Sequence, residues 1–580
     1  MKKILKFLIP YRWWILCAVA GTALGAFSEL FLPYLLAEIV NIATTGEVNA
    51  QIAIIGNGMR MLLVIISTVL AASVGNYCSS RGVTGFARDL RTSVFHKVQS
   101  FSQAEMDKFG PASLITRNTN DVTQIQMFFL MFLRIIVRSP VMLVGGVIMA
   151  YTRDARLARP LVFSVPVILV MIILVSRTVM PLFQVYQKKL DAVNLVLREQ
   201  IHGIRVIRAF RNENHEELRF DKVNQEMRDT GLKMMRTTMA MMPALTIVMN
   251  ATVVAIVWFG GMEAQNNADM QAGELLAVIQ YVMQIMFSLV MMSMVFVMYP
   301  RAQASAERIE EVLDTVPAII DKETTLSPTE GTEPSLKFQD VTFRFPGAER
   351  PALEHISFSA SKGETVAFIG STGSGKSSLL NLVMRFYDVS EGVILVNGID
   401  VRDYAQQDLR ARIGCVPQQS QLFSGTIADN LRFGYTQAGE VDMVGAAATA
   451  QALDFIQKRE GGFDSEVSQG GGNLSGGQRQ RLAIARAVAR SPEIYLFDDS
   501  FSALDFSTDA KLRAVLREKT DNAIVLIVAQ RVATIMNADR IIVLDNGNIS
   551  GIGSHKELMD SCEIYKEIVS SQFAEGEVAV

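Results

Sequence analysis

Six apolar segments, each long enough to cross a lipid bilayer as a helix, lie within the first 300 residues of this 580-residue chain. They cover residues 13–36, 52–77, 128–151, 157–179, 239–259 and 275–299. A spanning helix needs roughly twenty apolar residues, because every backbone polar group must be hydrogen-bonded within the segment. Six such segments, spaced in pairs, favour a membrane domain over the buried helices of a soluble protein.

Two long polar stretches separate the second segment from the third and the fourth from the fifth. They are too long and too helix-prone to be simple loops, so we expect the spanning helices to continue through them as amphipathic rods. Basic residues concentrate in these stretches and in the N-terminal segment MKKILKFLIPYR, which we expect to lie on the membrane surface. Both are therefore placed in the cytosol. One loop, YTRDARLAR, disagrees, because Arg153, Arg156 and Arg159 lie on the side predicted to be outside.

Composition excludes several other classes of protein. Half of the residues are hydrophobic and 19% are charged, which fits a membrane domain joined to a soluble one. The net charge of -3 gives no electrostatic case for a nucleic-acid partner. The four cysteines, Cys17, Cys78, Cys415 and Cys562, form no CxxC pair, so neither a disulfide framework nor a cysteine metal site is indicated.

The sequence changes character after residue 299. ERIEEVLDT continues as a soluble helix, and PAIIDKETTLSPTEGTEPS reads as a polar linker. Short apolar strands then alternate with turns and helices, which is typical of an α/β domain around a partly parallel sheet. We therefore expect an all-α, six-helix membrane domain at 1–313, a linker at 314–335 and an α/β domain at 336–580.

The run GSTGSGKSS follows the apolar strand TVAFI and precedes the helical stretch SLLNLVMRF. This is the context in which a glycine-rich loop binds phosphates through its backbone N–H groups and the helix N-terminus. Lys376 would neutralise the β and γ phosphates and Ser377 would ligate Mg²⁺. The candidate ATP-binding residues of this run are Gly370, Ser371, Thr372, Gly373, Ser374, Gly375, Lys376, Ser377 and Ser378.

A second phosphate-binding element follows in NLSGGQRQRLAIARA, where a short polar run opens an amphipathic helix. One site in the domain already holds the phosphates, so a second makes sense if two such domains pair head to tail. Each domain would then close the nucleotide of the other. The residues that would complete the partner's site are Leu474, Ser475, Gly476, Gly477 and Gln478.

With these motifs on one chain, the second half resembles the nucleotide-binding domain of an ABC transporter. The matching pieces are the phosphate loop, the signature LSGGQ, the strand IYLFD, the loop SALD and the stretch VPQQSQLFSGTIADNL. Six preceding helices with two long cytosolic excursions resemble a type IV exporter half-transporter. The resemblance implies ATP and Mg²⁺ as cofactors, and an α/β P-loop fold for the second domain.

The resemblance also implies roles for single residues. Phe345 would stack on the adenine, and Gln418 would sense Mg²⁺ and the attacking water. Magnesium ligands would come from Ser377, Gln418 and Asp498. Two turns of the membrane domain, at 109–117 and 211–217, would dock on nucleotide-binding domains. The implied D-loop consists of Ser502, Ala503, Leu504 and Asp505.

Two departures from the family pattern fall on the chemistry. Most of the family has Glu after the Asp of the apolar strand, whereas this chain has Asp499, which is one methylene shorter. The family's switch histidine falls at Gln530, a neutral amide that cannot carry a proton or a positive charge. A third sign is Gln469, where many exporters have Glu. These residues predict a site that binds ATP and hydrolyses it slowly.

The complete LSGGQ signature beside a weakened site favours a heterodimer. A non-identical half-transporter would supply the catalytic Glu and the switch His, and this chain's signature would complete that partner's active site. The chain therefore resembles the degenerate-site subunit of a bacterial heterodimeric multidrug ABC exporter. We expect it in the bacterial inner (cytoplasmic) membrane, with its N-terminus and nucleotide-binding domain in the cytosol.

The cargo is less constrained, and hydrophobic or amphipathic compounds are the expectation. Methionines are frequent in the last two apolar segments, Met286 among them, and they either fit varied apolar cargo or simply pack between helices. Glu29, Arg134 and Arg138 are charged residues within apolar segments, and they either line the path or, for the arginines, snorkel to the interface. A lipid flippase and an ATP-regulated membrane protein that does not pump stay as alternatives.

Overall fold

The structure is a computed structural model that describes residues 2–45, 50–266, 271–329, 331–435 and 439–572. The chain divides into two compact units. One contains Met1–Gln99 and Gly110–Thr315, and the other contains Ser100–Phe109 and Val316–Val580. The ten residues Ser100–Phe109 thus belong to the second unit, although they lie within the stretch 1–313 that the sequence assigns to the membrane domain.

The first unit is built from helices alone among its described residues. Six helical stretches there are long and apolar enough to cross a membrane, which confirms the predicted number. The elements are α1 (Lys2–Leu5), η1 (Lys6–Tyr11), α2 (Arg12–Glu29), α3 (Phe31–Thr45), α4 (Ala50–Gln99), α6 (Pro111–Thr116), η2 (Arg117–Asp121), α7 (Val122–Met131), η3 (Phe132–Ile136), α8 (Val137–Arg153), α9 (Arg159–Ala209), α10 (Glu213–Asn266) and α11 (Ala272–Asp314).

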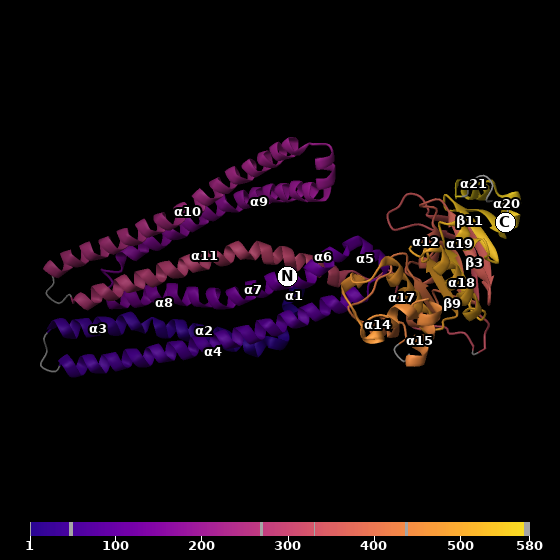
Figure 1. Cartoon of the computed structure of the whole chain (residues 1–580). Helices are drawn as coiled ribbons and strands as arrows, with labels where there is room; N and C mark the ends of the chain where they lie inside the picture. The colour runs from indigo at the N-terminus through magenta and orange to yellow at the C-terminus, as the bar shows by residue number, and fades with distance from the viewer. Residues whose placement is uncertain (1, 46–49, 267–270, 330, 436–438, 573–580) are drawn as a thin grey trace. The chain divides into compact units, whose positions relative to one another are not determined.

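Three of these helices are far longer than a bilayer requires (Figure 1). α4 has 50 residues, α9 has 51 and α10 has 54. At a rise of 1.5 Å per residue such helices extend over roughly 75–80 Å, whereas the hydrocarbon core is about 30 Å thick. Each helix must therefore continue well beyond the membrane as a polar rod.

Close packing of α2 on α4 depends on glycine. A Cβ atom added at Gly21 would lie 2.8 Å from the backbone nitrogen of Gly75, so only glycines let the two backbones approach this closely. Small residues have this role between helices in membranes, where apolar burial alone gives little driving force. Elsewhere in the unit, the buried Tyr281 hydroxyl donates a hydrogen bond of 2.9 Å to the carbonyl of Leu30, which joins α11 to the end of α2.

The second unit contains all of the described strands. They are β1 (Ser335–Phe343), β2 (Leu353–Ser361), β3 (Thr365–Gly370), β4 (Glu391–Val396), β5 (Ile399–Asp400), β6 (Ile413–Val416), β7 (Gly425–Thr426), β8 (Glu466–Val467), β9 (Ile494–Asp498), β10 (Ile524–Val528), β11 (Arg540–Asp545) and β12 (Asn548–Gly553). The helices are α5 (Gln103–Phe109), α12 (Lys376–Val383), α13 (Gln406–Ala411), α14 (Ile427–Arg432), α15 (Glu440–Thr449), α16 (Leu453–Gln457), α17 (Gly476–Ala489), α18 (Phe506–Lys519), α19 (Val532–Ile535), α20 (His555–Ser561) and α21 (Glu563–Gln572).

The main sheet has the strand order β12-β11-β3-β10-β9-β6. Its strands from β11 to β6 run parallel, and β12 is antiparallel to β11. A second sheet, β2-β1-β4-β5, is antiparallel. Parallel neighbours need crossover connections, and helices between the strands supply them. The predicted fold class, an all-α membrane domain followed by a partly parallel α/β domain, is confirmed.

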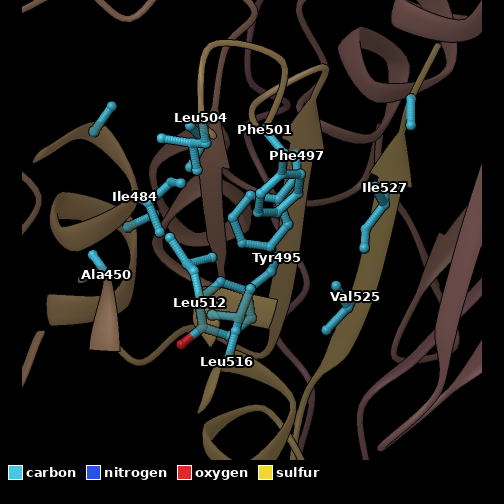
Figure 2. Close-up of a cluster of buried hydrophobic side chains, with 14 of the residues drawn as sticks. Ala450, Ile484, Tyr495, Phe497, Phe501, Leu504, Leu512, Leu516, Val525 and Ile527 are labelled. Atoms are coloured by element: carbon cyan, nitrogen blue, oxygen red, sulfur yellow. The ribbon is translucent and has the colours of Figure 1, made fainter. Parts of the chain in front are cut away.

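Apolar runs in β9 and β10 hold the sheet in place because they are buried on both faces, as parallel strands usually are. Every residue of β10 is buried, and so are the first four residues of β9. Figure 2 shows the core on one face of these strands, where the fully buried Phe497 lies beside Tyr495 and Phe501. This packing fixes the carboxyl ends of the strands, from which the functional loops emerge.

Candidate functional site

Three neighbouring strands end at the same edge of the main sheet. β3 leads into the glycine-rich loop, β9 ends at Asp498, and β10 ends two residues before Gln530. Val528 of β10 is in register with Phe368 of β3 on one side and with Asp498 of β9 on the other. Because β10 lies between the other two strands, residues that are far apart in sequence emerge side by side.

The phosphate loop has a conformation that only glycine allows at its last turn before α12. Gly375 has φ 95°, and a Cβ atom there would lie 2.6 Å from Cδ2 of Leu353. The next side chain, Lys376, curls over the loop, and its Nζ donates hydrogen bonds of 2.8 Å to the carbonyl of Gly370 and 2.7 Å to that of Ser371. Burial lowers the pKa of the Lys376 ammonium, while the nearby carboxylates of Asp498 and Asp499 oppose this. An ammonium held here suits an anionic phosphate.

The arrangement of Ser377 and Asp498 fits a magnesium ion. The Ser377 hydroxyl donates a 2.9 Å hydrogen bond to Oδ1 of Asp498, so two hard oxygen ligands lie together at the foot of the loop. Burial raises the pKa of Asp498; the Ser377 hydrogen bond lowers it, the neighbouring Asp499 raises it and Lys376 lowers it. Mg²⁺ uses one or two protein ligands together with waters and substrate phosphates, and these two side chains supply such ligands.

The two residues that depart from the family pattern are in contact. Nε2 of Gln530 donates a 3.1 Å hydrogen bond to Oδ2 of Asp499 across 31 positions of sequence. Asp499 has φ 48°, a left-handed conformation that Asp tolerates better than most residues, and its backbone N–H donates to the Val528 carbonyl at 2.9 Å. Burial raises the pKa of Asp499, and hydrogen bonds from Ser502 oppose this most.

The signature motif forms the start of α17. Ser475 is the N-cap, with its hydroxyl accepting from the Gln478 backbone N–H at 3.2 Å, and the Gln478 side chain accepts from the Ser475 N–H at 2.9 Å. Ser475 and Gly476 are exposed, which leaves the motif available to a second molecule. Leu474, by contrast, is buried in the core of its own domain.

Gln480 connects the signature helix to the loops after β9, a connection that the sequence analysis missed. Its Oε1 accepts a 3.1 Å hydrogen bond from the Ala503 backbone, and its Nε2 donates to the Asp499 carbonyl at 3.4 Å. The residue is only 4% exposed. A signal was present in the sequence: Gln480 falls in register with the apolar stripe of its helix, at i, i+3 and i+4 with the buried Ala483 and Ile484.

The D-loop is held locally. The Ser502 hydroxyl donates to the Asp499 carbonyl at 2.9 Å, and Asp505 caps α18 by accepting from the Thr508 N–H at 2.9 Å. Hydrogen bonds from Thr508 and Ser507 hold the pKa of Asp505 well below its usual range. Gln418 lines a cavity of about 350 Å³ together with Gly476 and Ala503. Gln418, the residue predicted to sense Mg²⁺ and water, thus lies beside the signature and the D-loop of the same chain.

Phe345 lies on the surface at 36% exposure. Its ring meets those of Phe343 and Tyr387 edge-on, with centroid distances of 4.8 and 5.4 Å, so the ring is supported from behind. Helix α5 packs in the same unit, where the Tyr387 hydroxyl donates to Asp107. Of the docking turn predicted at 109–117, Phe109 belongs to this unit, whereas Gly110 and the residues after it belong to the other unit. The turn at 211–217, between α9 and α10, also lies in that unit.

The charged residues within the membrane helices line a second cavity, of about 300 Å³. Nη2 of Arg138 lies 2.6 Å from Oε2 of Glu29, and Nη2 of Arg134 donates to the Ser80 hydroxyl at 3.1 Å. Met286, the fourth residue predicted for a substrate path, does not line this cavity: its side chain is 4% exposed and packs in the helical core. Met291 of the same helix lines the cavity.

Comparison with known proteins agrees with both halves. Residues 15–289 match the model of the ABC transporter transmembrane region, and residues 353–502 match the model of the ABC transporter family. An uncharacterized ABC transporter ATP-binding protein of Mycobacterium tuberculosis (strain CDC 1551 / Oshkosh) is 42% identical over 97% of this chain and 96% of its own length. The uncharacterized ABC transporter ATP-binding protein YfiB of Bacillus subtilis (strain 168) is 36% identical over 99% of both chains.

Two further comparisons concern proteins with a stated activity or a solved structure. An ATP-dependent lipid A-core flippase of Haemophilus influenzae (strain 86-028NP) is 30% identical over 99% of this chain and 97% of its own length. A solved structure of a bacterial Atm1-family ABC exporter with ATP bound superposes with a TM-score of 0.78 and 25% identity, covering 97% of this chain and 99% of that one.

Proposed function

Because this chain belongs to the ABC transporter family, as a type IV half-transporter with its ATPase domain on the same polypeptide, we propose that it is the slowly hydrolysing subunit of an ATP-driven heterodimeric exporter. Its own phosphate loop binds ATP with Mg²⁺, held by Lys376, Ser377 and Asp498, and its signature completes the active site of a non-identical partner. ATP binding closes the paired nucleotide-binding domains, and the long helices carry that movement to the membrane.

One observation carries the proposal: the 3.1 Å hydrogen bond from the Gln530 amide to the Asp499 carboxylate. A general base must reach the water whose proton it takes, and a displacement of about 1 Å can cost roughly a hundredfold in rate. Asp499 is one methylene too short, and one of its oxygens is occupied by an amide that cannot stabilise charge as an imidazolium does. Hydrolysis at this site is therefore slow, while phosphate binding is intact.

The intact signature supports the heterodimer. The exposed Ser475 and Gly476 stand at the start of a well-capped helix of 14 residues, a geometry that favours an anion from a second chain. Two copies of this chain would pair two weakened sites. A partner with Glu and His at the positions of Asp499 and Gln530 would instead have one fully equipped site.

ATPase assays test the proposal. The chain purified alone should release phosphate slowly while retaining an ATP analogue, and the chain co-purified with the half-transporter encoded beside it should hydrolyse ATP at an ordinary exporter rate. A homodimer that turns over as fast as that complex would contradict the proposal. Absence of a neighbouring half-transporter with Glu and His at the two positions would also count against it.

The cargo site is the cavity of about 300 Å³ that contains Glu29, Arg134 and Arg138. Charged groups at membrane depth are costly and mark substrate or ion paths. With two arginines to one carboxylate, the cavity favours drug-like amphipathic cargo with an acidic group. A second candidate, a flippase for a lipid-like anion, is supported by the same cavity and by the 30% identity to a lipid A-core flippase. Transport assays on Arg134→Ala test whether the cargo is anionic: transport of an anionic amphiphile should fall, and transport of a zwitterionic one should change less.

The orientation follows from the basic residues. We place the nucleotide-binding domain, the N-terminus and the turn at 211–217 in the cytosol of a bacterial cell, with the membrane helices in its cytoplasmic membrane. Cysteine accessibility at the turn between α9 and α10 in intact cells and in inverted vesicles checks this arrangement. Labelling of intact cells at that turn would reverse it.

A further inference from the structure

An apolar groove of about 710 Å³ lies between the start of α9 and the end of α10, at the end of these helices away from their connecting turn. Its lining includes Phe163, Val167, Ala251 and Phe259, all drawn from helices that are long and apolar enough to span a membrane. The volume lies within the roughly 300–1,000 Å³ of pockets that hold small molecules. The groove belongs to the membrane unit alone and shares no residue with the cavity around Glu29.

Two arginines stand at the mouth of this groove, Arg156 and Arg159. They belong to the loop YTRDARLAR, whose positive charge opposes the orientation that the other loops indicate. Arg153 of the same loop forms an ion pair, with its Nε 3.1 Å from Oε2 of Glu274. Arg159, in contrast, forms no ion pair among the residues that the structure describes, and both mouth arginines are exposed.

A buried hydroxyl lies deeper in the groove. Ser164 is 6% exposed, and its Oγ has no hydrogen-bond partner in the described structure. A helical serine usually returns its hydroxyl to the carbonyl three or four residues earlier, as Thr252 on the opposite wall does at 2.7 Å to Val248. An unpaired buried hydroxyl costs free energy, so this one suits a polar ligand atom.

We propose that this groove binds one anionic phospholipid of the surrounding leaflet. The phosphate pairs with the guanidinium groups of Arg156 and Arg159 at the interface, an ester oxygen accepts from the Ser164 hydroxyl, and an acyl chain lies along Phe163 and Ala251. Guanidinium groups pair well with phosphate because their planar donors match its oxygens. The proposal also accounts for basic residues in a loop predicted to be outside.

The length of the groove favours a lipid over a soluble anion. From Arg159 to Val167 the wall on α9 rises about 12 Å, at 1.5 Å per residue. One leaflet contributes about half of a 30 Å hydrocarbon core, or roughly 15 Å. The groove therefore starts at charges suited to the interface and runs inward by about one leaflet, with apolar walls. A small soluble anion would use the arginines and leave those walls bare.

Native mass spectrometry on the full-length chain, delipidated in detergent, tests the proposal. We expect phosphatidylglycerol to bind more tightly than phosphatidylcholine with the same acyl chains, and the preference to fall by about thirtyfold in the Arg156→Gln/Arg159→Gln variant, at roughly fivefold per arginine. The matched control is Arg60→Gln, an exposed arginine on α4 outside the groove. It should keep the full preference.

A second pair of variants tests the groove without changing charge. Ala251→Trp fills the groove and should weaken both lipids at least tenfold, whereas Val254→Trp, on the exposed outer face of the same helix, should not. Equal binding of the two lipids to the wild-type chain would overturn the proposal. So would losses in Arg60→Gln and Val254→Trp as large as those in the matched groove variants. So would competition by glycerol phosphate at the concentration of whole lipid, which indicates a soluble anion, or loss of the lipid when the partner chain is bound, which indicates a subunit interface.

Discussion

Restoring the two variant residues should convert this chain into a hydrolytic homodimer. In Asp499→Glu the carboxylate is extended by one methylene, and Gln530→His replaces the amide that now donates to Oδ2 of Asp499 at 3.1 Å. The phosphate loop, Asp498 and the signature are present, so these two positions are the departures from the family pattern that fall on the chemistry. A correction of about 1 Å in a catalytic group is worth roughly a hundredfold, or ~2.7 kcal/mol of activation free energy. We expect a gain of that order for the double variant.

Phosphate release by the purified full-length chain in lipid nanodiscs, with saturating Mg²⁺ and ATP, measures the gain. The series is wild type, each single variant and the double variant, with Lys376→Ala as the blank. Asp521→Glu is the matched control, since it adds the same methylene at an exposed turn away from the site. Binding of an ATP analogue should be equal in all except the blank, which separates chemistry from nucleotide affinity.

The pH dependence gives an independent check. Burial raises the pKa of Asp499, so the protonated, inactive carboxylic acid persists to higher pH than for an exposed aspartate. Residual activity of the wild-type site should therefore fall as pH decreases through that raised pKa. The reasoning is refuted if the rate of phosphate release rises less than about threefold in the double variant while that variant still binds the ATP analogue. It is also refuted if the wild-type chain alone releases phosphate as fast as the double variant.

Three further predictions concern contacts in the second unit. Gln480→Ala should lower the ATPase rate of the two-chain complex and destabilise the unit by about 1–3 kcal/mol in denaturant unfolding, because it removes two hydrogen bonds, one from the Ala503 N–H and one to the Asp499 carbonyl, whereas ATP-analogue binding by the chain should not change. Tyr387→Phe removes the hydrogen bond to Asp107 of α5, and transport per ATP hydrolysed should fall more than the rate of hydrolysis itself. Adding Asp107→Asn to the Tyr387→Phe variant should cause no further loss, because both changes remove the same contact. His355 has a raised pKa because the Asp340 carboxylate accepts a hydrogen bond of 2.8 Å from its ring. The stability that this pair contributes is complete below the ordinary histidine pKa and is lost as pH rises through the raised pKa. The difference in Tm between wild type and Asp340→Asn should therefore vanish at high pH.

Local features of the chain were predictable. The six spans are set by the thickness of the bilayer and by the need to pair every backbone group, and both act on a continuous window of sequence. The phosphate loop is likewise continuous, from Gly370 to Ser378, and its strand and helix flank it directly. For this reason the fold class, the membrane domain and the loop with Lys376 could be predicted without an alignment.

Side-chain burial within the membrane was not predictable. Met286 and Met291 are one residue type, five positions apart on one helix, yet the first is in the core and the second lines the cavity. Apolar residues face the lipid, a neighbouring helix or a cavity alike, so composition cannot separate them. The same ambiguity concealed the groove at Arg159, which exists only because α9 and α10 pack side by side.

The sequence by itself determined that this chain spans a membrane and carries a phosphate-binding α/β domain, because those signals are local and repeat at fixed spacing. Tertiary structure alone decided which distant residues meet. Asp499 and Gln530 touch because β10 is inserted next to β9, and α5 belongs to the second unit although it lies between two helices of the first. The order of the strands and the assignment of α5 to the second unit depend on how the chain crosses over and packs, and neither can be read from a local stretch of sequence.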